Sequence, residues 1–151
     1  MIRASLLAAA LLAAPLAVHA ETGDSVYGRT CAACHLPGGK GVPGAFPRLS
    51  GRAGAIAGVP VGRKAMVSIV LFGSAGPLQV EQQSISGVMP GFGQLKDDEI
   101  AAVLTYISGL EGKHPKAFTT AEVAKVRAGA ALSPSEVNGL LRDPAVVKAA
   151  P

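Results

Sequence analysis

The chain has 151 residues, with 14 Lys and Arg against 10 Asp and Glu, which gives a formal net charge of +4. The basic residues form no cluster, so the charge balance argues against nucleic acid as a partner. The chain contains no Trp, two Tyr and four Phe. A core built only from these few large side chains would be thin for a chain of this length.

Residues 1–20 have the pattern of an export signal. Arg3 supplies a positive charge, an apolar run follows, and Val18-His19-Ala20 is typical of a small-residue cleavage site. The apolar run is too short to span a membrane, and no later segment reaches that length. We therefore predict cleavage after Ala20, a periplasmic location, and no membrane span in the mature chain.

The segment from Asp24 to about His35 is predicted to be helical, and it ends in the string Cys31-Ala32-Ala33-Cys34-His35. A C-x-x-C-H string is typical of covalent haem attachment. Its two thiols lie on one side of a helical turn, where both can add to the vinyl groups of one porphyrin. We predict one haem c bound through Cys31 and Cys34, with His35 as the proximal iron ligand. A buried porphyrin would also supply apolar surface that the core lacks.

Two other kinds of site use a C-x-x-C pair. A thioredoxin-like redox pair requires a preceding strand in a βαβ unit, and no such strand is visible. A zinc site requires further ligands at a suitable spacing. The chain has no third cysteine, and its other histidines are His19, inside the predicted signal, and His114, far along the chain. Both alternatives are weaker than haem attachment.

The middle of the chain changes from a long loop to helices. Residues 36–62 are rich in Gly and Pro, and we predict a loop there that wraps the flat face of the porphyrin. Arg63 to about Gly73 is predicted to be a helix, although its Val and Ile content also permits a strand. Asp97 to Leu110 is the clearest helix, with acidic residues in its first turn. Its apolar face is formed by Ile100, Val103, Leu104 and Ile107.

A second axial ligand is needed on the side of the iron opposite His35. Met89 is followed by Pro90, which restricts it to extended conformations, and nearby glycines allow close backbone approach. Met66 lies in an apolar helix and is suited to the core. His114 follows the last helix of the haem-binding segment. We favour Met89 as the distal iron ligand.

Residues 113–151 are predicted to form a C-terminal helical extension after a basic hinge at 113–116. Thr119 with Glu122, and Ser133 with Glu136, form two capping boxes that predict two short helices. The extension either packs on its own domain or docks on a partner. We expect it to be unnecessary for the haem spectrum and potential, because the haem-binding fold should close before Gly112.

Residues 23–110 resemble the class I monohaem cytochromes c. The resemblance rests on the C-x-x-C-H string, on Pro47-Arg48-Leu49-Ser50-Gly51 and on Met89-Pro90. It implies an all-α fold, with helices wrapped around one covalent haem in a domain at 21–112.

The same resemblance implies roles for several further residues. The carbonyl of Pro47 would accept the imidazole N–H of His35, and Pro47, Arg48 and Leu49 would form part of the haem environment. Arg48 is a candidate contact to a haem propionate. The resemblance also implies that Gly23 and Tyr27 pack against Val103 and Tyr106.

A finer resemblance links the chain to the cytochrome partners or subunits of periplasmic dehydrogenases. It is carried by the segments 46–51, 69–73, 87–92 and 99–107. It implies an electron carrier, not an enzyme, which accepts electrons from a periplasmic dehydrogenase. A terminal oxidase or another cytochrome of the respiratory chain would be the acceptor.

Other functions are compatible with a bound haem. Catalysis or gas binding needs an open iron position, and ligation by both His35 and Met89 argues against one. The chain is alternatively a haem-containing subunit of a dehydrogenase complex. A further alternative is a docking module whose C-terminal extension sets the choice of partner.

Overall fold

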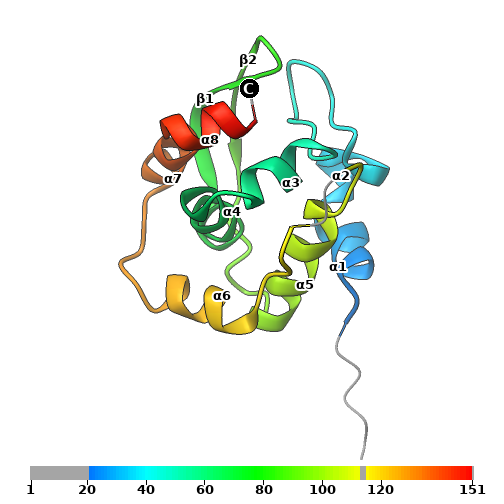
Figure 1. Cartoon of the computed structure of the whole chain (residues 1–151), viewed down its shortest axis with the longest axis vertical. Helices are drawn as coiled ribbons and strands as arrows, with labels where there is room; N and C mark the ends of the chain where they lie inside the picture. The colour runs from blue at the N-terminus through cyan, green and yellow to red at the C-terminus, as the bar shows by residue number, and fades with distance from the viewer. Residues whose placement is uncertain (1–20, 113–114, 151) are drawn as a thin grey trace, which may run out of the picture.

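The computed structural model describes residues 21–112 and 115–150. The predicted export signal and His114 lie outside the described residues. Figure 1 shows a mostly helical fold with one two-stranded hairpin beside α7 and α8. In chain order the elements are α1 (Gly23–Thr30), α2 (Ala32–His35), the 3-10 turn Pro37–Gly39, α3 (Arg52–Ala57), α4 (Pro60–Phe72), β1 (Ser74–Val80), β2 (Gln83–Met89), α5 (Asp97–Ser108), α6 (Thr120–Arg127), α7 (Pro134–Leu141) and α8 (Pro144–Ala149).

The first helix packs closely against α5. A Cβ atom at Gly23 would lie 2.3 Å from the carbonyl oxygen of Ala102 and 2.8 Å from Cβ of Tyr106, so only glycine fits this crossing. One helical turn later, the rings of Tyr27 and Tyr106 lie with their centroids 5.4 Å apart. The pairing of the N-terminal helix with Tyr106 is thus confirmed.

The predicted long loop contains ordered structure. The turn Pro37–Gly39 and α3 interrupt it, and α4 begins at Pro60, which occupies the first helical turn where its missing N–H is tolerated. Of the two alternatives for residues 63–73, the helix is confirmed. It ends at Gly73, whose φ of 80° is accessible mainly to glycine.

The hairpin was not part of the all-α prediction. The strands β1 and β2 are antiparallel, with Ser74 opposite Met89, Gly76 opposite Gly87 and Leu78 opposite Ile85. Because side chains alternate along a strand, these six residues share one face of the hairpin. The fold class is nevertheless confirmed, since the chain is mostly helical and has this one small hairpin in its described part.

The predicted α5 is confirmed in its position and its buried face. Ile100, Val103 and Leu104 are almost completely buried, and Ile107 is buried too. The side chain of Glu99 accepts a hydrogen bond from the backbone N–H of Lys96, which caps the first turn. The helix therefore lies within the core, in contact with α1 and with α6.

Both capping boxes in the C-terminal extension are confirmed. The hydroxyls of Thr119 and Ser133 accept hydrogen bonds from the backbone N–H groups of Glu122 and Glu136, at the starts of α6 and α7. A third helix, α8, follows behind an Asp143 cap. Figure 1 shows this extension, coloured orange to red, passing beside α5 and then over α4 to the hairpin.

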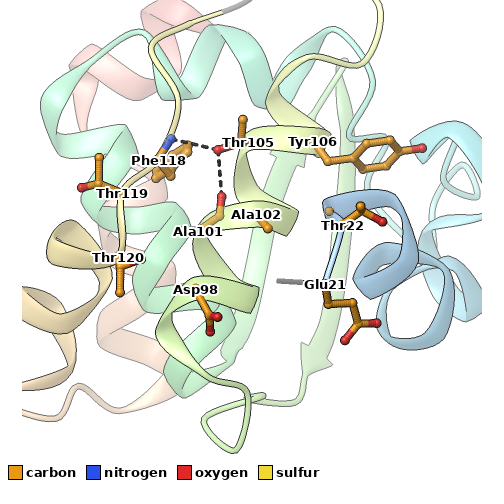
Figure 2. Close-up of a pocket in the computed structure, with 11 residues that line it drawn as sticks. Glu21, Thr22, Asp98, Ala101, Ala102, Thr105, Tyr106, Phe118, Thr119 and Thr120 are labelled. Atoms are coloured by element: carbon orange, nitrogen blue, oxygen red, sulfur yellow. Dashed lines mark hydrogen bonds between the residues drawn. The ribbon is translucent and has the colours of Figure 1, made fainter. Parts of the chain in front are cut away.

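The extension packs on its own domain. The helix α6 contacts α4 and α5, α7 contacts α4 and β1, and α8 contacts α3 and α4. Phe118, which precedes α6, is buried, and its N–H donates to the Thr105 hydroxyl at 2.9 Å. Figure 2 shows this link beside the start of α1. The extension thus packs on its own domain, and docking of the extension on a partner stays a prediction.

The length and hydropathy of a helix decide whether it can cross a membrane. None of the helices in residues 21–112 and 115–150 is long and apolar enough to cross a membrane.

Candidate haem site

A deep cavity of about 520 Å³ lies between α2, α4, α5, the hairpin and α7. Most of its surface is apolar, with side chains such as Leu49, Ile56, Val70, Leu104 and Ile107 on its wall. Cys31, Cys34, His35 and Met89 reach the same cavity. It therefore offers an apolar enclosure and a set of sulfur and nitrogen ligands together.

The two cysteines lie on a single turn at the edge of the cavity. Cys31 stands at the junction of α1 and α2, and its N–H continues the helical hydrogen bonds to the carbonyl of Tyr27. Neither thiol forms a disulfide, Cys34 is exposed and Cys31 is partly buried. Burial raises the pKa of the Cys31 thiol to about 11. Both sulfurs thus lie beside the cavity free of a disulfide, as attachment to vinyl groups requires.

The imidazole of His35 is oriented by the loop that follows it. Its Nδ1 lies 2.9 Å from the carbonyl oxygen of Pro47, so Nδ1–H donates to that oxygen and Nε2 keeps its lone pair. The side chain is buried, and burial lowers its pKa, while the Pro47 bond acts in the opposite direction. A neutral imidazole with a free Nε2 is the form that binds iron.

Tight backbone contacts hold this loop in place. The N–H of Gly41 donates to the carbonyl of His35 at 2.8 Å, and the hydroxyl of Tyr27 donates to the carbonyl of Leu36 at 2.6 Å. A Cβ at Gly41 would lie 2.6 Å from the carbonyl oxygen of Phe46, and its φ is +65°. The loop is therefore a fixed support for the histidine ring.

Met89 enters the cavity from the last position of β2. The segment behind it packs backbone to backbone against the end of α4, where a Cβ at Gly73 would lie 2.5 Å from the carbonyl oxygen of Met89. The N–H of Phe92 donates to the carbonyl of Val70 at 2.7 Å and anchors the other end of the segment. Met66 also reaches the cavity wall, but it lies in α4 among the buried core residues.

Arg48 and Leu49 also line the cavity, as the resemblance implied. Leu49 packs against the core. The guanidinium of Arg48 is bound by acidic side chains, with Nε donating to Glu81 at 2.8 Å and a further nitrogen 3.7 Å from Glu111. Glu81 lies in the turn of the hairpin, so Arg48 connects the proximal loop to that turn.

Two parts of the wall were not anticipated from the sequence. The inner face of the hairpin supplies Leu78 and Ile85, and α7 supplies Asn138 and Leu141. No short-range pattern marks these residues, because their approach to the haem motif depends on the path of the extension. Since α7 forms part of the wall, residues 113–151 lie beside the haem pocket. Whether they are unnecessary for the haem spectrum and potential remains to be tested by truncation.

A second depression lies elsewhere, between the start of α1 and the start of α6 (Figure 2). Its wall includes Thr22, Ala102, Tyr106 and Thr120. It is open to solvent and contains neither cysteine nor histidine. Within the described residues there is also no group of three or more His, Cys, Asp or Glu side chains placed to hold a metal ion. The deep cavity is therefore the candidate site.

A flat apolar cofactor with iron at its centre fits this cavity and its donors. The two cysteine thiols lie at one edge. The imidazole of His35, whose Nδ1–H is hydrogen-bonded to the Pro47 carbonyl, lines the cavity, and the remaining wall is largely apolar. An arrangement of this kind, on a helical fold, defines the c-type cytochromes.

Comparison with known proteins identifies the family. The family model described as cytochrome c oxidase, cbb3-type, subunit III matches residues 18–107, and the chain belongs to this family of monohaem class I cytochromes c. It is 41% identical over 136 residues to a cytochrome c-552 from Thermus thermophilus, covering 87% of this chain and 90% of the relative. A second cytochrome c-552 from the same species is 42% identical over 120 residues, covering 76% and 90%.

A third relative is named as a subunit of a dehydrogenase. It is the gluconate 2-dehydrogenase cytochrome c subunit of Pantoea cypripedii, 37% identical over 109 residues, which are 71% of this chain and 24% of the relative. Membership of the cytochrome c family, together with Cys31 and Cys34, implies one covalent haem c. The protein is an electron carrier and not an enzyme.

Proposed function

We propose that this cytochrome transfers single electrons through a haem whose iron is bound by His35 and Met89. The observation that supports the proposal is that both side chains line one cavity and that hydrogen bonds hold the backbone near each of them. Haem c supplies a redox-active iron that takes up or releases one electron. The protein holds that iron, keeps water away and sets the electron affinity.

The backbone contacts around Met89 make it a better distal ligand than Met66. Its segment is pinned at Gly73 and at Phe92, so its thioether is presented from a stiff support. Met66 instead forms part of the buried face of α4, among Val67, Val70 and Leu71. Drawing Met66 toward iron would open a gap in that face.

Ligation on both faces favours electron transfer over catalysis. When both axial positions are held by the protein, a substrate or a gas has no free position on iron. Besides His35, the described residues of the cavity wall include no Asp, Glu or Lys that could act as a general acid or base. Little needs to move when the electron arrives, because each ligand is supported by its own backbone contacts.

The mouth of the cavity is the natural place for electrons to enter and leave. Cys34 is exposed there, and Phe46 and Val88 present apolar surface with exposed fractions of 41% and 75%. A partner that covers this rim would bring its own redox centre close to the thioether edge. We assign this rim as the contact surface for redox partners.

The proposed donor is a periplasmic dehydrogenase, and the proposed acceptor is a terminal oxidase or another cytochrome of the respiratory chain. The relative from Pantoea cypripedii is a dehydrogenase subunit by name, which supports the donor class and also the alternative that this chain is itself such a subunit. A role with a cbb3-type oxidase is supported by the name of the family. Export to the periplasm follows from the pattern of residues 1–20.

A redox titration of the purified holoprotein tests the function. It should show one reversible one-electron transition, and neither oxidation state should bind cyanide or carbon monoxide readily. Rapid binding of either ligand to the wild-type protein would reveal an open iron position and would contradict the proposal. Co-purification with a dehydrogenase in constant ratio would select the subunit alternative.

A further inference from the structure

The cavity wall contains one buried polar group that the protein leaves without a partner. Asn138 of α7 is 3% exposed, and its Oδ1 has no hydrogen bond within the described residues. The side chain lines the cavity. A buried amide oxygen without a partner costs about 1–3 kcal/mol, so such groups normally have a partner in the complete assembly.

The hairpin leaves a notch beside this amide. Gly76 and Gly87 are opposite each other in the two strands, on the face that also carries Leu78, Ile85 and Met89. A Cβ at Gly76 would meet only Asn138, with Oδ1 at 3.6 Å, and a Cβ at Gly87 would meet no atom within 4 Å. The paired glycines thus open a gap toward the cavity, and Asn138 forms one side of that gap.

The hairpin crosses an edge of the cavity. One end of it carries Met89, on the proposed distal side. At the other end, Glu81 in the turn is bound to Arg48, next to the Pro47 carbonyl that holds His35. A ribbon that runs from the distal to the proximal side has to pass along one edge of a flat group between them.

That edge is the one away from the cysteines. The helix α2, which carries Cys34 and directly follows Cys31, contacts α1 and the turn Pro37–Gly39, whereas the hairpin packs against α7 (Figure 1). A haem carries its two vinyl groups and its two propionates on opposite edges. The hairpin edge is therefore the propionate edge. Arg48, which is bound to Glu81 and Glu111, and Arg52 also line the cavity.

We propose that the notch formed by Gly76, Gly87 and Asn138 receives one haem propionate, and that the amide of Asn138 donates a hydrogen bond to it. The amide can present its NH₂ group instead of its oxygen by a half-turn of the side chain. A hydrogen bond to a carboxylate is charge-assisted and strong in a site with little water. The C-terminal extension thereby takes part in setting the electron affinity of the haem.

The direction of the change in reduction potential follows from the negative charge of the propionate. A donor on the propionate partly neutralises its negative charge, and less negative charge beside iron favours the reduced state. Loss of the donor should lower the potential, and a second negative charge should lower it more. This inference rests on the proposed electron-transfer function, since it assigns a means of tuning the same haem.

Two substitutions and one control test the notch in the full-length holoprotein. Asn138→Leu removes the donor at similar size, and Gly87→Ala places a methyl group in the open gap at a position without a positive φ. The control Gly139→Ala changes the next residue of α7, which is exposed and where an added Cβ would meet no atom within 4 Å. Asn138→Asp adds the second negative charge.

The direct readout is the vibration of the propionate itself. Cells fed 5-aminolaevulinate labelled with ¹³C at its carboxyl carbon make haem with labelled propionates, and redox-difference infrared spectra then isolate their bands. One labelled band should shift in Asn138→Leu and in Gly87→Ala, and neither should shift in Gly139→Ala. The equilibrium constant for reduction by a reference dye should fall by a factor of about two to ten in Asn138→Leu, and further in Asn138→Asp.

The outcomes separate this inference from the proposed function. If Asn138→Leu and Gly87→Ala leave both labelled bands unchanged in a protein with a reversible haem, the notch is not a propionate site, while electron transfer stands. A change confined to the methionine-to-iron charge-transfer band would place the amide on the thioether and overturn the proposal. Absence of covalent haem in the wild-type protein would instead refute the proposed function itself.

Discussion

Arg63 in α4 and Glu122 in α6 are joined by two hydrogen bonds, from Nε to Oε1 at 2.9 Å and from a terminal nitrogen to Oε2 at 3.0 Å. The same guanidinium donates to the carbonyl oxygens of Lys116 and Ala117, and it lies 3.8 Å from the centre of the Phe118 ring. Arg127 makes a similar set of bonds at the far end of α6, to Asp97 and to two carbonyls. The extension is thus attached to its own domain by two arginines, beside its apolar contacts.

The Arg63–Glu122 pair predicts a specific dependence of stability on pH. Hydrogen bonding by Arg63 lowers the pKa of Glu122 to about 2, from an ordinary value of 4.5. A lowered folded-state pKa means that the pair stabilises the protein fully above about pH 4.5 and loses this contribution as the pH falls toward 2. The Glu122 side chain is 40% exposed, so solvent screening limits the gain to about 1 kcal/mol.

Thermal unfolding of wild type and Glu122→Gln measures this contribution. The variant should unfold at a lower temperature at pH 7, and the difference should shrink at about pH 3. Arg63→Met in the same experiments supplies the double-mutant cycle, and the two changes should not be additive at pH 7. A difference between wild type and Glu122→Gln that is equal at both pH values would rule out the assigned linkage.

Gly23 and Gly28 provide a matched pair of substitutions in α1. Gly23→Ala should destabilise by several kcal/mol, because the new methyl group would lie 2.3 Å from the carbonyl oxygen of Ala102. Gly28→Ala meets nothing within 4 Å and should stabilise by about 1 kcal/mol through helix propensity. Urea unfolding of both variants measures these changes in the free energy of unfolding. Equal effects of the two substitutions would contradict the close α1–α5 crossing.

Substitution of the two methionines tests the distal ligand. Met89→Ala should abolish the weak near-red charge-transfer band of the ferric protein, lower the potential and allow added imidazole or cyanide to bind iron. Met66→Leu nearly conserves side-chain volume, so it should keep the band and cost less than about 1.5 kcal/mol of stability. Loss of the band in Met66→Leu, with its retention in Met89→Ala, would assign the ligand to α4 instead.

Mass spectrometry tests haem attachment and export together. The mature protein should begin at Glu21 and carry the mass of one haem, which acidified acetone should not extract. Cys31→Ala and Cys34→Ala should each retain one thioether, with a red-shifted absorption maximum that reports the unreacted vinyl group. Haem that washes out of the wild-type protein would disprove covalent binding.

Truncation after Gly112 measures what the extension contributes. It removes Phe118, Val123, Leu141 and Val146 from the core, and Asn138 from the cavity wall. We expect a loss of several kcal/mol of stability and a lower potential. An unchanged melting temperature and potential in the truncated holoprotein would show that the extension is only an appendage. A docking role is tested separately by comparing the rates of reduction by a dehydrogenase and by ascorbate.

Local sequence predicted those elements whose signals are also local. The C-x-x-C-H string, the capping boxes at Thr119 and Ser133, and the apolar stripe of α5 each depend on residues a few positions apart. Each of the helices predicted from them is present. The axial roles of His35 and Met89 and the export signal remain predictions.

The hairpin was missed because its turn lacks the usual residues. The strands are joined by Glu81 and Gln82, whose φ values are 49° and 65°. A two-residue turn with both φ values positive normally has Asn or Gly there. Gly76 and Pro77 also interrupt the alternation of β1, which hides the strand period. The positions of Asn138 and Leu141 in the cavity wall depend on long-range packing that no local pattern encodes.

The position of α7 in the cavity wall bears on the order of folding and haem insertion. Asn138 and Leu141 come more than one hundred residues after Cys34, so the thiols are available long before this part of the wall exists. A chain folded only as far as α5 leaves the hairpin side of its cavity uncovered. We therefore expect the cofactor to be inserted before α7 packs, so that late residues of the chain complete the wall around it.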